Sequence, residues 1–572
     1  MKPHTRPLWS WALSGVFPGA VAGALFGGLF FFLNPGLPFT VATVLRTLTF
    51  FGLIGSVASV LLHIPLSSTK WIQPWRLLPW TMTLVLGAAA LLDWVHASRF
   101  SFYLPPALDN RLIKAAIWLS IATLISFYTA LLHTLQRRSY GTGSRLLLIS
   151  CACLSVLLTV ERRAAYSPGI RLPSRALLLS QIEPATLLVV GIDGATLEAI
   201  LPLTGQGHLP FLTNLTQQGA YGRLVTLHPT VKSPLWFSLA TGRYPFRHGI
   251  VSEKQRRAPF VSPDARLGLL PAGLGISHWG PVLGMSVDPA PAVPRAPALW
   301  ELLRQTGART ALVAWPAPLR SMAGADVVIT ESLLSDRSPS PLDGPPEAVA
   351  QAIASRVAAS SLAPESYLPF GDDPDERLRE ALARDLWREA IARQQLSEGF
   401  DAVFVHLDGL QEIASRFFGG YVAFQFQGQQ GVDLEEASKI ITAYYAHLDG
   451  VLSRLWDDLP QPRLMVIASA WGTDEAGTLR SLTSSLTGNG RSLSGRFDTA
   501  PDGILMLLGD NLSSGTFLDR AHLLDLTPTV LYGLGLPVAR DLPGTVLTKS
   551  FSAAFLNRTP LTFVPAYPYS DG

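Results

Sequence analysis

The chain has 572 residues, of which only 15% are Asp, Glu, Lys or Arg, while 48% are apolar and the mean hydropathy is +0.28. Soluble domains contain roughly 25% charged residues, so this composition excludes a disordered chain and argues against a wholly soluble one. The formal net charge of +3 gives no sign of the concentrated basic face that nucleic-acid binding requires. The only cysteines, Cys151 and Cys153, exclude a disulfide framework and a cysteine-based zinc site.

Residues 1–160 consist of long apolar runs with few charges. A bilayer core of about 30 Å requires roughly 20 helical residues, and soluble helices would show polar faces that these runs lack. Four further runs follow the first one, which argues against a cleaved signal peptide. We therefore predict about five membrane helices, the fifth of them short, over residues 9–33, 47–64, 79–95, 115–134 and 146–160.

Basic residues in short loops predict the orientation of these helices, because such loops are enriched on the cytoplasmic side. Three basic segments share one side if all five helices span: Lys2 and Arg6; Lys70 and Arg76; Arg137, Arg138 and Arg145. We expect a linker at 161–184 and a soluble domain at 185–572, both extracytoplasmic. Four arginines on the outer side oppose this assignment: Arg99, Arg111, Arg162 and Arg163. If the fifth run does not span, the soluble domain becomes cytoplasmic.

The soluble part has the pattern of an α/β domain. It opens with the apolar run LLVVGI, typical of a strand covered on both faces, and this run ends at Asp193. Further strand patterns lie at 310–315, 402–407, 464–468 and 504–508, with helical patterns at 297–307, 377–397 and 434–456. This alternation predicts a doubly wound sheet with helices on both faces. Stretches rich in Pro and Gly at 253–296 and 331–375 are typical of insertions.

Asp193 comes at the carboxyl end of a strand, where open α/β sheets place their ligands and catalytic groups. A turn or helix-capping role is the alternative for a carboxylate followed by Gly194.

Seven segments of this domain follow one another in a recognisable order. They are GIDGATLEAILPLTGQGHLPFLTNLTQQGAYGRL from residue 191, SPLWFSLATGRYPFRHGI (233–250), PALWELLRQTGARTALVAWP (297–316), AVFVHLDGL (402–410), IASAWG (467–472), PDGILMLLG (501–509) and LDLTPTVLYGLGLPVARDLPGTVL (524–547). Together they resemble the alkaline phosphatase superfamily, and within it the type I phosphodiesterase/nucleotide pyrophosphatase branch. The resemblance implies metal-assisted phosphoryl or sulfuryl transfer, with two divalent metals, about six Asp and His ligands and a Ser or Thr nucleophile.

The ligand set implied by the resemblance is largely missing from this chain. Asp193 matches the strand-end Asp of the family, and Ser233 is the candidate nucleophile if this chain has one deletion in the loop TVKSPLWFSLATG relative to the family. Without that deletion Lys232 takes the nucleophile's place, and Thr230 is a poorer candidate. The other five ligand positions hold Gln411, Ser415, Ala470, Trp471 and Thr499. Alanine has no donor atom and tryptophan offers only an N–H, so these residues argue against a two-metal centre.

Nearby carboxylates and histidines do not obviously replace the missing ligands. Asp408, Glu412, Asp474 and Asp498 are neighbours of the lost positions, but neighbouring side chains point in other directions on a strand or helix. We interpret His406 and the other histidines as surface or packing residues, and Lys232 as a residue of a solvated loop.

These observations predict a membrane-anchored pseudoenzyme that binds or scaffolds at the membrane surface and holds no metal cofactor. Its expected partners are membrane lipid, a phosphorylated lipid or glycan, or a membrane protein, and not nucleic acid. The alternative is an active phosphodiesterase or phosphotransferase that acts on lipid-linked or glycan substrates with two divalent metals (zinc or manganese), similar in architecture to phosphoethanolamine and phosphoglycerol transferases. A transporter is disfavoured, because Asp93 and Arg46 lie near predicted helix ends and no inverted repeat is evident.

Overall fold

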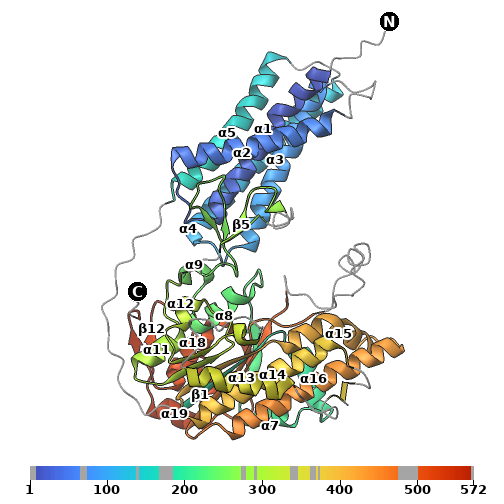
Figure 1. Cartoon of the computed structure of the whole chain (residues 1–572). Helices are drawn as coiled ribbons and strands as arrows, with labels where there is room; N and C mark the ends of the chain where they lie inside the picture. The colour runs from blue at the N-terminus through green and yellow to red at the C-terminus, as the bar shows by residue number, and fades with distance from the viewer. Residues whose placement is uncertain are drawn as a thin grey trace. The chain divides into compact units, whose positions relative to one another are not determined.

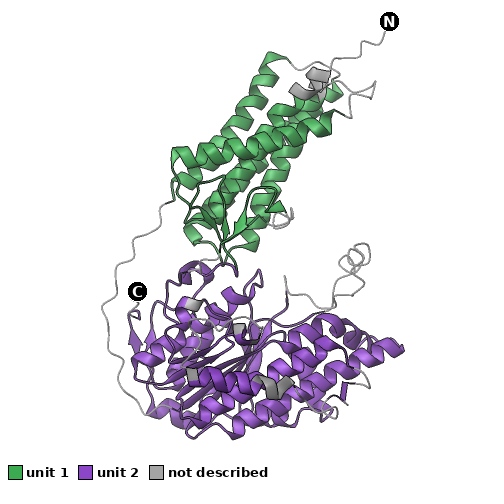
Figure 2. Cartoon of the chain, viewed as in Figure 1, with its two compact units in different colours: residues 1–171, 254–291 green, residues 172–253, 292–572 purple. Residues whose placement is uncertain are grey.

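The computed structural model describes residues 8–64, 74–136, 141–166, 185–271, 279–288, 293–334, 346–360, 367, 369–370, 374–474 and 500–567. The chain forms two compact units, one of residues 1–171 with 254–291 and the other of residues 172–253 with 292–572 (Figure 2). Several residues used in the sequence analysis lie outside the described residues: Lys2, Arg6, Lys70, Arg137, Arg138, Asp498 and Thr499.

The first unit is built on five long helices (Figure 1). They are α1 Leu8–Leu33, α2 Val41–His63, α3 Pro74–Arg99, α4 Pro106–Leu135 and α5 Thr142–Ala164. Within the described part of the chain, all five contain a stretch long and apolar enough to cross a membrane. This confirms the predicted helices, and α5 has 23 residues, which removes the doubt about its length. Large apolar side chains point outward, such as Leu62 (73% exposed) and Leu84 (71%), as expected of helices surrounded by lipid.

Residues 254–291 belong to this helical unit although they interrupt the other unit in sequence. They contain a small antiparallel sheet of β3 Arg256–Arg257, β4 Arg266–Leu267 and β5 Ser286–Val287. The side chain of Asn34, in the loop after α1, accepts hydrogen bonds from the N–H groups of Gly268 and Leu269 and donates one to the carbonyl of Leu269. Phe260 packs in the same buried cluster as Phe30 of α1. The insertion that the sequence predicts at 253–296 is therefore docked on the helices.

The second unit contains, in its described residues, an eight-stranded sheet of order β11-β2-β10-β9-β1-β8-β6-β7. The strands are β1 Thr186–Ile192, β2 Ala220–Val225, β6 Thr310–Val313, β7 Val327–Ile329, β8 Ala402–Leu407, β9 Arg463–Ser469, β10 Gly503–Gly509 and β11 Thr516–His522. All run in one direction except β10, which is antiparallel to both β9 and β2. The predicted α/β architecture is confirmed, as a mixed sheet.

Helices cover both faces of this sheet, as the sequence predicts. Alternate side chains of β1 enter two separate cores, Leu188 and Val190 on one face and Leu187 and Val189 on the other. The first core is closed by α6 Leu197–Gly205, α7 Pro210–Gln218, α14 Glu376–Ser397, α15 Gly409–Gln425 and α16 Val432–Asp457. The second is closed by α8 Lys232–Thr241, α11 Leu299–Gln305 and α18 Leu526–Gly533. The described residues of the unit also contain these shorter elements: α9 Pro245–His248, α12 Leu319–Met322, η2 Glu331–Leu334, α13 Pro346–Ser360, η4 Leu523–Asp525, β12 Val538–Ala539, η5 Thr548–Ser550, α19 Ala553–Arg558 and β13 Phe563–Val564.

Candidate functional site

Two carboxylates emerge side by side at the carboxyl edge of the sheet. Strands β1 and β8 are parallel and pair Ile192 with Leu407, so the residues that follow, Asp193 and Asp408, leave the sheet together. Lys232, the first residue of α8, places its ammonium 3.1 Å from Oδ2 of Asp193 and 3.6 Å from Oδ2 of Asp408. The interpretation of Lys232 as a solvated loop residue is thus wrong, because a helix that begins at this residue directs its side chain to the strand ends.

Asp193 is 1% exposed and every one of its near partners is a donor. Its Oδ1 accepts the indole N–H of Trp236 at 2.8 Å and lies 3.0 Å from Nε2 of His406. Burial opposes ionisation, yet His406 and Lys232 outweigh it and lower the pKa of Asp193 below its ordinary value. Since an ionised carboxylate only accepts hydrogen bonds, His406 must carry its proton on Nε2. His406 is therefore a site residue, contrary to the packing role expected from the sequence.

Asp408 is held by arginines of α14 rather than left free. Arg388, which is 1% exposed, makes a bidentate contact with it, from Nη1 to Oδ1 at 2.7 Å and from Nη2 to Oδ2 at 3.2 Å. Its Nη2 also lies 3.1 Å from Glu331. Arg384 lies 3.4 Å from Asp408 and 2.6 Å from Glu412. Burial disfavours the ionised form of Asp408, but the positive charges of Arg388 and Lys232 outweigh this effect and hold the pKa of Asp408 far below its ordinary value.

Aromatic rings fill the space beside Asp193. Trp236 of α8 packs edge-on against Trp315 at 5.2 Å and His406 at 5.1 Å between ring centroids, and lies 6.1 Å from Trp471. All three tryptophans are at most 3% exposed, and Ala470 is fully buried. The end of β9, where the resemblance implies an Asp and a His, therefore supplies an apolar wall.

The remaining predicted site residues lie on two helices. Gln411 of α15 lies near Gly194, and its Oε1 is buried without a hydrogen-bond partner in the described part of the chain. Ser415 turns back to its own helix and donates to the carbonyl of Glu412 at 2.7 Å. Ser233 lies half-buried in the first turn of α8, directly after Lys232.

The residues present do not fit a two-metal centre. Among the described residues, one group brings three ligand atoms within 4.8 Å of one another: Glu331, His406 and Asp408. Arg388 already bonds both carboxylates, and Nε2 of His406 is engaged with Asp193. Only Nδ1 of His406, buried and unpartnered among the described residues, is available. The group falls well short of the ligands that two metals require.

The sequence contained a signal for part of this network. Arg384 and Arg388 are spaced by four residues on a predicted helix, so they share one face, and His406 and Asp408 flank Leu407 at a strand end. Glu331 and Trp315 carry no such local signal, because only the order of β6, β7 and β8 in the sheet brings them here.

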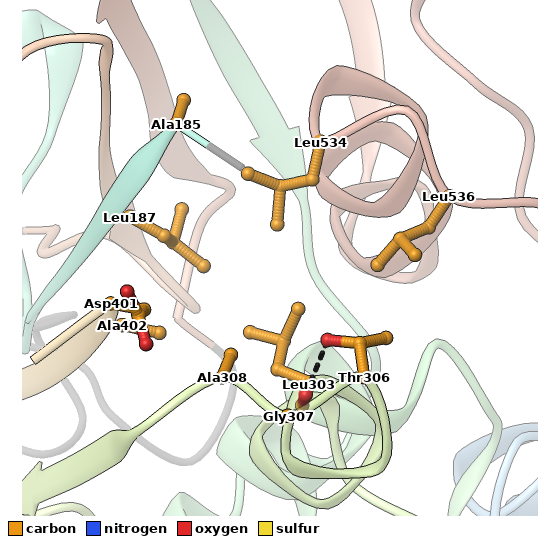
Figure 3. A pocket seen from close by; sticks show the side chains of 10 residues that line it. All are labelled: Ala185, Leu187, Leu303, Thr306, Gly307, Ala308, Asp401, Ala402, Leu534 and Leu536. Carbon is orange, nitrogen blue, oxygen red and sulfur yellow. Dashed lines mark hydrogen bonds between the residues drawn. The ribbon is translucent and has the colours of Figure 1, made fainter. Parts of the chain in front are cut away.

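A separate pocket of about 290 Å³ lies near the starts of β1 and β8, at the opposite edge of the sheet (Figure 3). It is lined by Ala185, Leu187, Leu303, Thr306, Gly307, Ala308, Asp401, Ala402, Leu534 and Leu536. The hydroxyl of Thr306 donates to the carbonyl of Leu303 at 2.6 Å, and Asp401 is the one charged residue among those that line the pocket. None of the charged residues around Asp193 lines this pocket.

Comparison with known proteins places these residues in context. The model of the type I phosphodiesterase/nucleotide pyrophosphatase family matches residues 187–483, which is more than half of the chain. Among curated proteins, none matches the chain in sequence. A solved structure of a phosphonate monoester hydrolase from Silicibacter pomeroyi is similar with 15% identity, 64% of this chain and 76% of that chain covered, and a TM-score of 0.35. Human ectonucleotide pyrophosphatase/phosphodiesterase 5 is similar with 11% identity, coverages of 65% and 99%, and a TM-score of 0.35.

Proposed function

Because the chain belongs to the type I phosphodiesterase/nucleotide pyrophosphatase family of the alkaline phosphatase superfamily, we propose that it is a membrane-anchored pseudoenzyme of that family. In this proposal, ion pairs within the chain replace the catalytic metals. The protein binds or scaffolds at the membrane surface and does not hydrolyse phosphodiesters.

The observation that carries the proposal is the position of the Lys232 ammonium between Asp193 and Asp408. A divalent metal needs carboxylate oxygens that are free to bind it. Here one carboxylate is matched by Lys232 and the other by Lys232 and Arg388, so a metal would have to expel a bound cation. Displacing the ammonium would also break an ion pair of an almost fully buried carboxylate.

The charges of the site do not favour a phosphate ligand either. Three cations (Lys232, Arg384, Arg388) face five carboxylates (Asp193, Glu331, Asp385, Asp408, Glu412) within the network. A site with this balance repels an added anion, since phosphate recognition relies on an excess of donors and positive charge. The proposed binding role therefore does not rest on the former catalytic centre.

The proposal places the second unit outside the cytoplasm, and the ends of the helices support this. Arg163 at the end of α5 donates from Nε to the carbonyl of Phe31 at 2.7 Å and from Nη2 to that of Pro35 at 3.1 Å. The chain therefore leaves α5 at the same end of the bundle as the uncharged loop after α1. Arg145 lies in the first turn of α5, at the other end of the bundle.

The alternative is an active enzyme on lipid-linked or glycan substrates, favoured by Nδ1 of His406, which lies beside Glu331 and Asp408 and has no hydrogen-bond partner among the described residues. The test is metal content and hydrolysis of an aryl phosphodiester by the full chain in detergent, with added zinc or manganese. We expect no stoichiometric metal and no turnover that depends on Ser233. Bound metal together with turnover that is lost in Ser233→Ala but kept in Ser415→Ala would refute the pseudoenzyme.

A further inference from the structure

We propose that the insertion, described over residues 254–271 and 279–288, is an interfacial membrane anchor, whose turn from Trp279 to Gly284 inserts into the headgroup region of the bilayer beside α1 and α2. The proposal concerns a surface of the helical unit and is independent of whether the protein is catalytic.

The depth at which the insertion docks is the first observation. Phe260 stacks on Phe50 at 5.2 Å with an interplanar angle of 6°, and meets Phe51 edge-on at 5.1 Å. These are the tenth and eleventh residues of α2, so the contact lies about 14 Å along the helix from Val41. Phe260 also meets Phe30, three residues before the end of α1, at 5.6 Å, so the insertion contacts both helices within their candidate spans and lies close to the end of α1.

The turn of the insertion presents apolar side chains in two directions. Its backbone is closed by hydrogen bonds from Leu283 N–H to the carbonyl of Trp279 at 3.0 Å and from Met285 N–H to that of Gly280 at 2.8 Å. Met285 points inward and is 6% exposed in the phenylalanine cluster, and Leu283 packs against the same cluster. Trp279 and Val282 point outward and are 57% and 76% exposed.

The composition of this outward surface matches a bilayer interface better than water. Val287 on β5 is a third exposed apolar residue, 55% exposed. Large apolar side chains gain free energy on leaving water, and tryptophan is enriched at the level of lipid headgroups. Because Leu283 and Met285 of the same turn pack on the cluster formed by the candidate membrane helices α1 and α2, the occupant that this outward surface fits is lipid.

The charge of the insertion points to anionic phospholipid. Its sequence has four basic residues (Lys254, Arg256, Arg257, Arg266) against two acidic ones (Asp264, Asp288), a net charge of +2. Arg257 and Arg266 share Asp288 as a partner, at 3.4 Å and 2.6 Å, and remain 53% and 51% exposed at their side chains. Juxtaposed apolar and basic groups are the combination that binds peripheral elements to anionic membranes.

The test uses the full chain in nanodiscs that contain phosphatidylcholine and phosphatidylglycerol. In a background with Cys151→Ala and Cys153→Ala, a single cysteine at Val282→Cys carries an environment-sensitive fluorophore. Lipids that are spin-labelled near the headgroup quench it if it lies in the interface. Val432→Cys is the matched control, a valine of the second unit that is 81% exposed, and Leu53→Cys on α2, 64% exposed, reports contact with lipid tails.

We expect quenching of the Val282 label to be several-fold greater than that of the Val432 label, and stronger with headgroup-labelled than with tail-labelled lipid. The Leu53 label should show the reverse preference. Quenching at Val282 no greater than at Val432 would overturn the proposal and leave this surface for a protein partner. A second measurement, the rate of reaction with a water-soluble maleimide in nanodiscs, should be slower for Val282→Cys than for Val432→Cys.

Discussion

The single positive charge of Lys232 pairs with two carboxylates, Asp193 and Asp408. Removing this charge should lower the free energy of unfolding. In Lys232→Ala, Asp193 keeps Trp236 and His406 but loses its ammonium partner while it stays buried. Breaking a buried ion pair from one side costs about 3 kcal/mol at the lower end of the usual range. We expect this loss in the free energy of unfolding of the full chain in detergent, measured by urea titration.

The control is an exposed ion pair of the same kind. Lys439 lies 2.7 Å from Glu435 on α16, and the two side chains are 69% and 50% exposed. Lys439→Ala should change stability by no more than about 0.5 kcal/mol, because water screens such pairs. Similar losses for both variants would mean that the network around Asp193 contributes no more than a surface contact.

His248 gives a prediction about pH. Its Nδ1 accepts the N–H of Ile250 at 3.2 Å and its Nε2 bonds Ser238 at 2.9 Å, so the buried ring is neutral. Burial, aided by the charge of Arg243, lowers the pKa of His248 to about 3. Between about pH 6.5 and pH 3 the unfolded chain therefore binds a proton that the folded chain does not, and stability is lost as pH falls.

The measurement compares the free energy of unfolding of wild type with that of His248→Gln across this pH range. The comparison is needed because protonation of other buried groups changes stability in the same range with the opposite sign. Burial raises the pKa of Asp385 to about 6, for example. We expect the stability advantage of wild type over the variant to shrink by up to about 1.4 kcal/mol per pH unit below pH 6.5. A difference that stays constant from pH 7 to pH 5 would mean that the folded protein protonates His248.

At the scale of elements, the prediction from sequence succeeded where a pattern was local. The five helices and the strands β1, β6, β8, β9 and β10 followed from apolar runs and their spacing. The direction of β10 and the pairing of β2 with β11 could not be predicted from such patterns, because they depend on partner strands far away in the chain. For the same reason Asp193 was identified and the role of Lys232 was missed: its charge matters only once α8 lies against two strand ends.

The crossing of α1 and α2 depends on three glycines, Gly19, Gly23 and Gly55, that no residue with a Cβ could replace without a shift of backbone. A Cβ at Gly19 would lie 2.3 Å from the carbonyl oxygen of Gly55, and one at Gly55 would lie 2.2 Å from that of Gly19. Small residues allow such close approach between membrane helices. We expect Gly19→Leu to destabilise the full chain by about 3 kcal/mol or more, measured by thermal unfolding in detergent.

A suitable comparison is Gly143→Leu in the first turn of α5, where a Cβ would meet nothing within 4 Å. That variant should lie within about 0.5 kcal/mol of wild type. Equal stability of Gly19→Leu and Gly143→Leu would mean that α1 and α2 can separate at this crossing without a loss of free energy. The packing of α1 on α2 would then not stabilise the unit.

At the scale of the whole molecule, the decisive property is the side of the membrane on which the second unit lies. Five spans place the residues before α1 and those after α5 on opposite sides. Each helix is long enough, since even the 23 residues of α5 extend about 35 Å.

In the same cysteine-free background, we expect Val432→Cys to react with an impermeant maleimide on intact cells, and Gly141→Cys, in the loop before α5, to react only after permeabilisation. The reverse pattern would put the second unit in the cytoplasm. Reaction of both cysteines from outside would mean that α5 does not cross the membrane. The basic residue Arg145 would then lie outside with the second unit, against the rule that basic residues near helix ends stay in the cytoplasm.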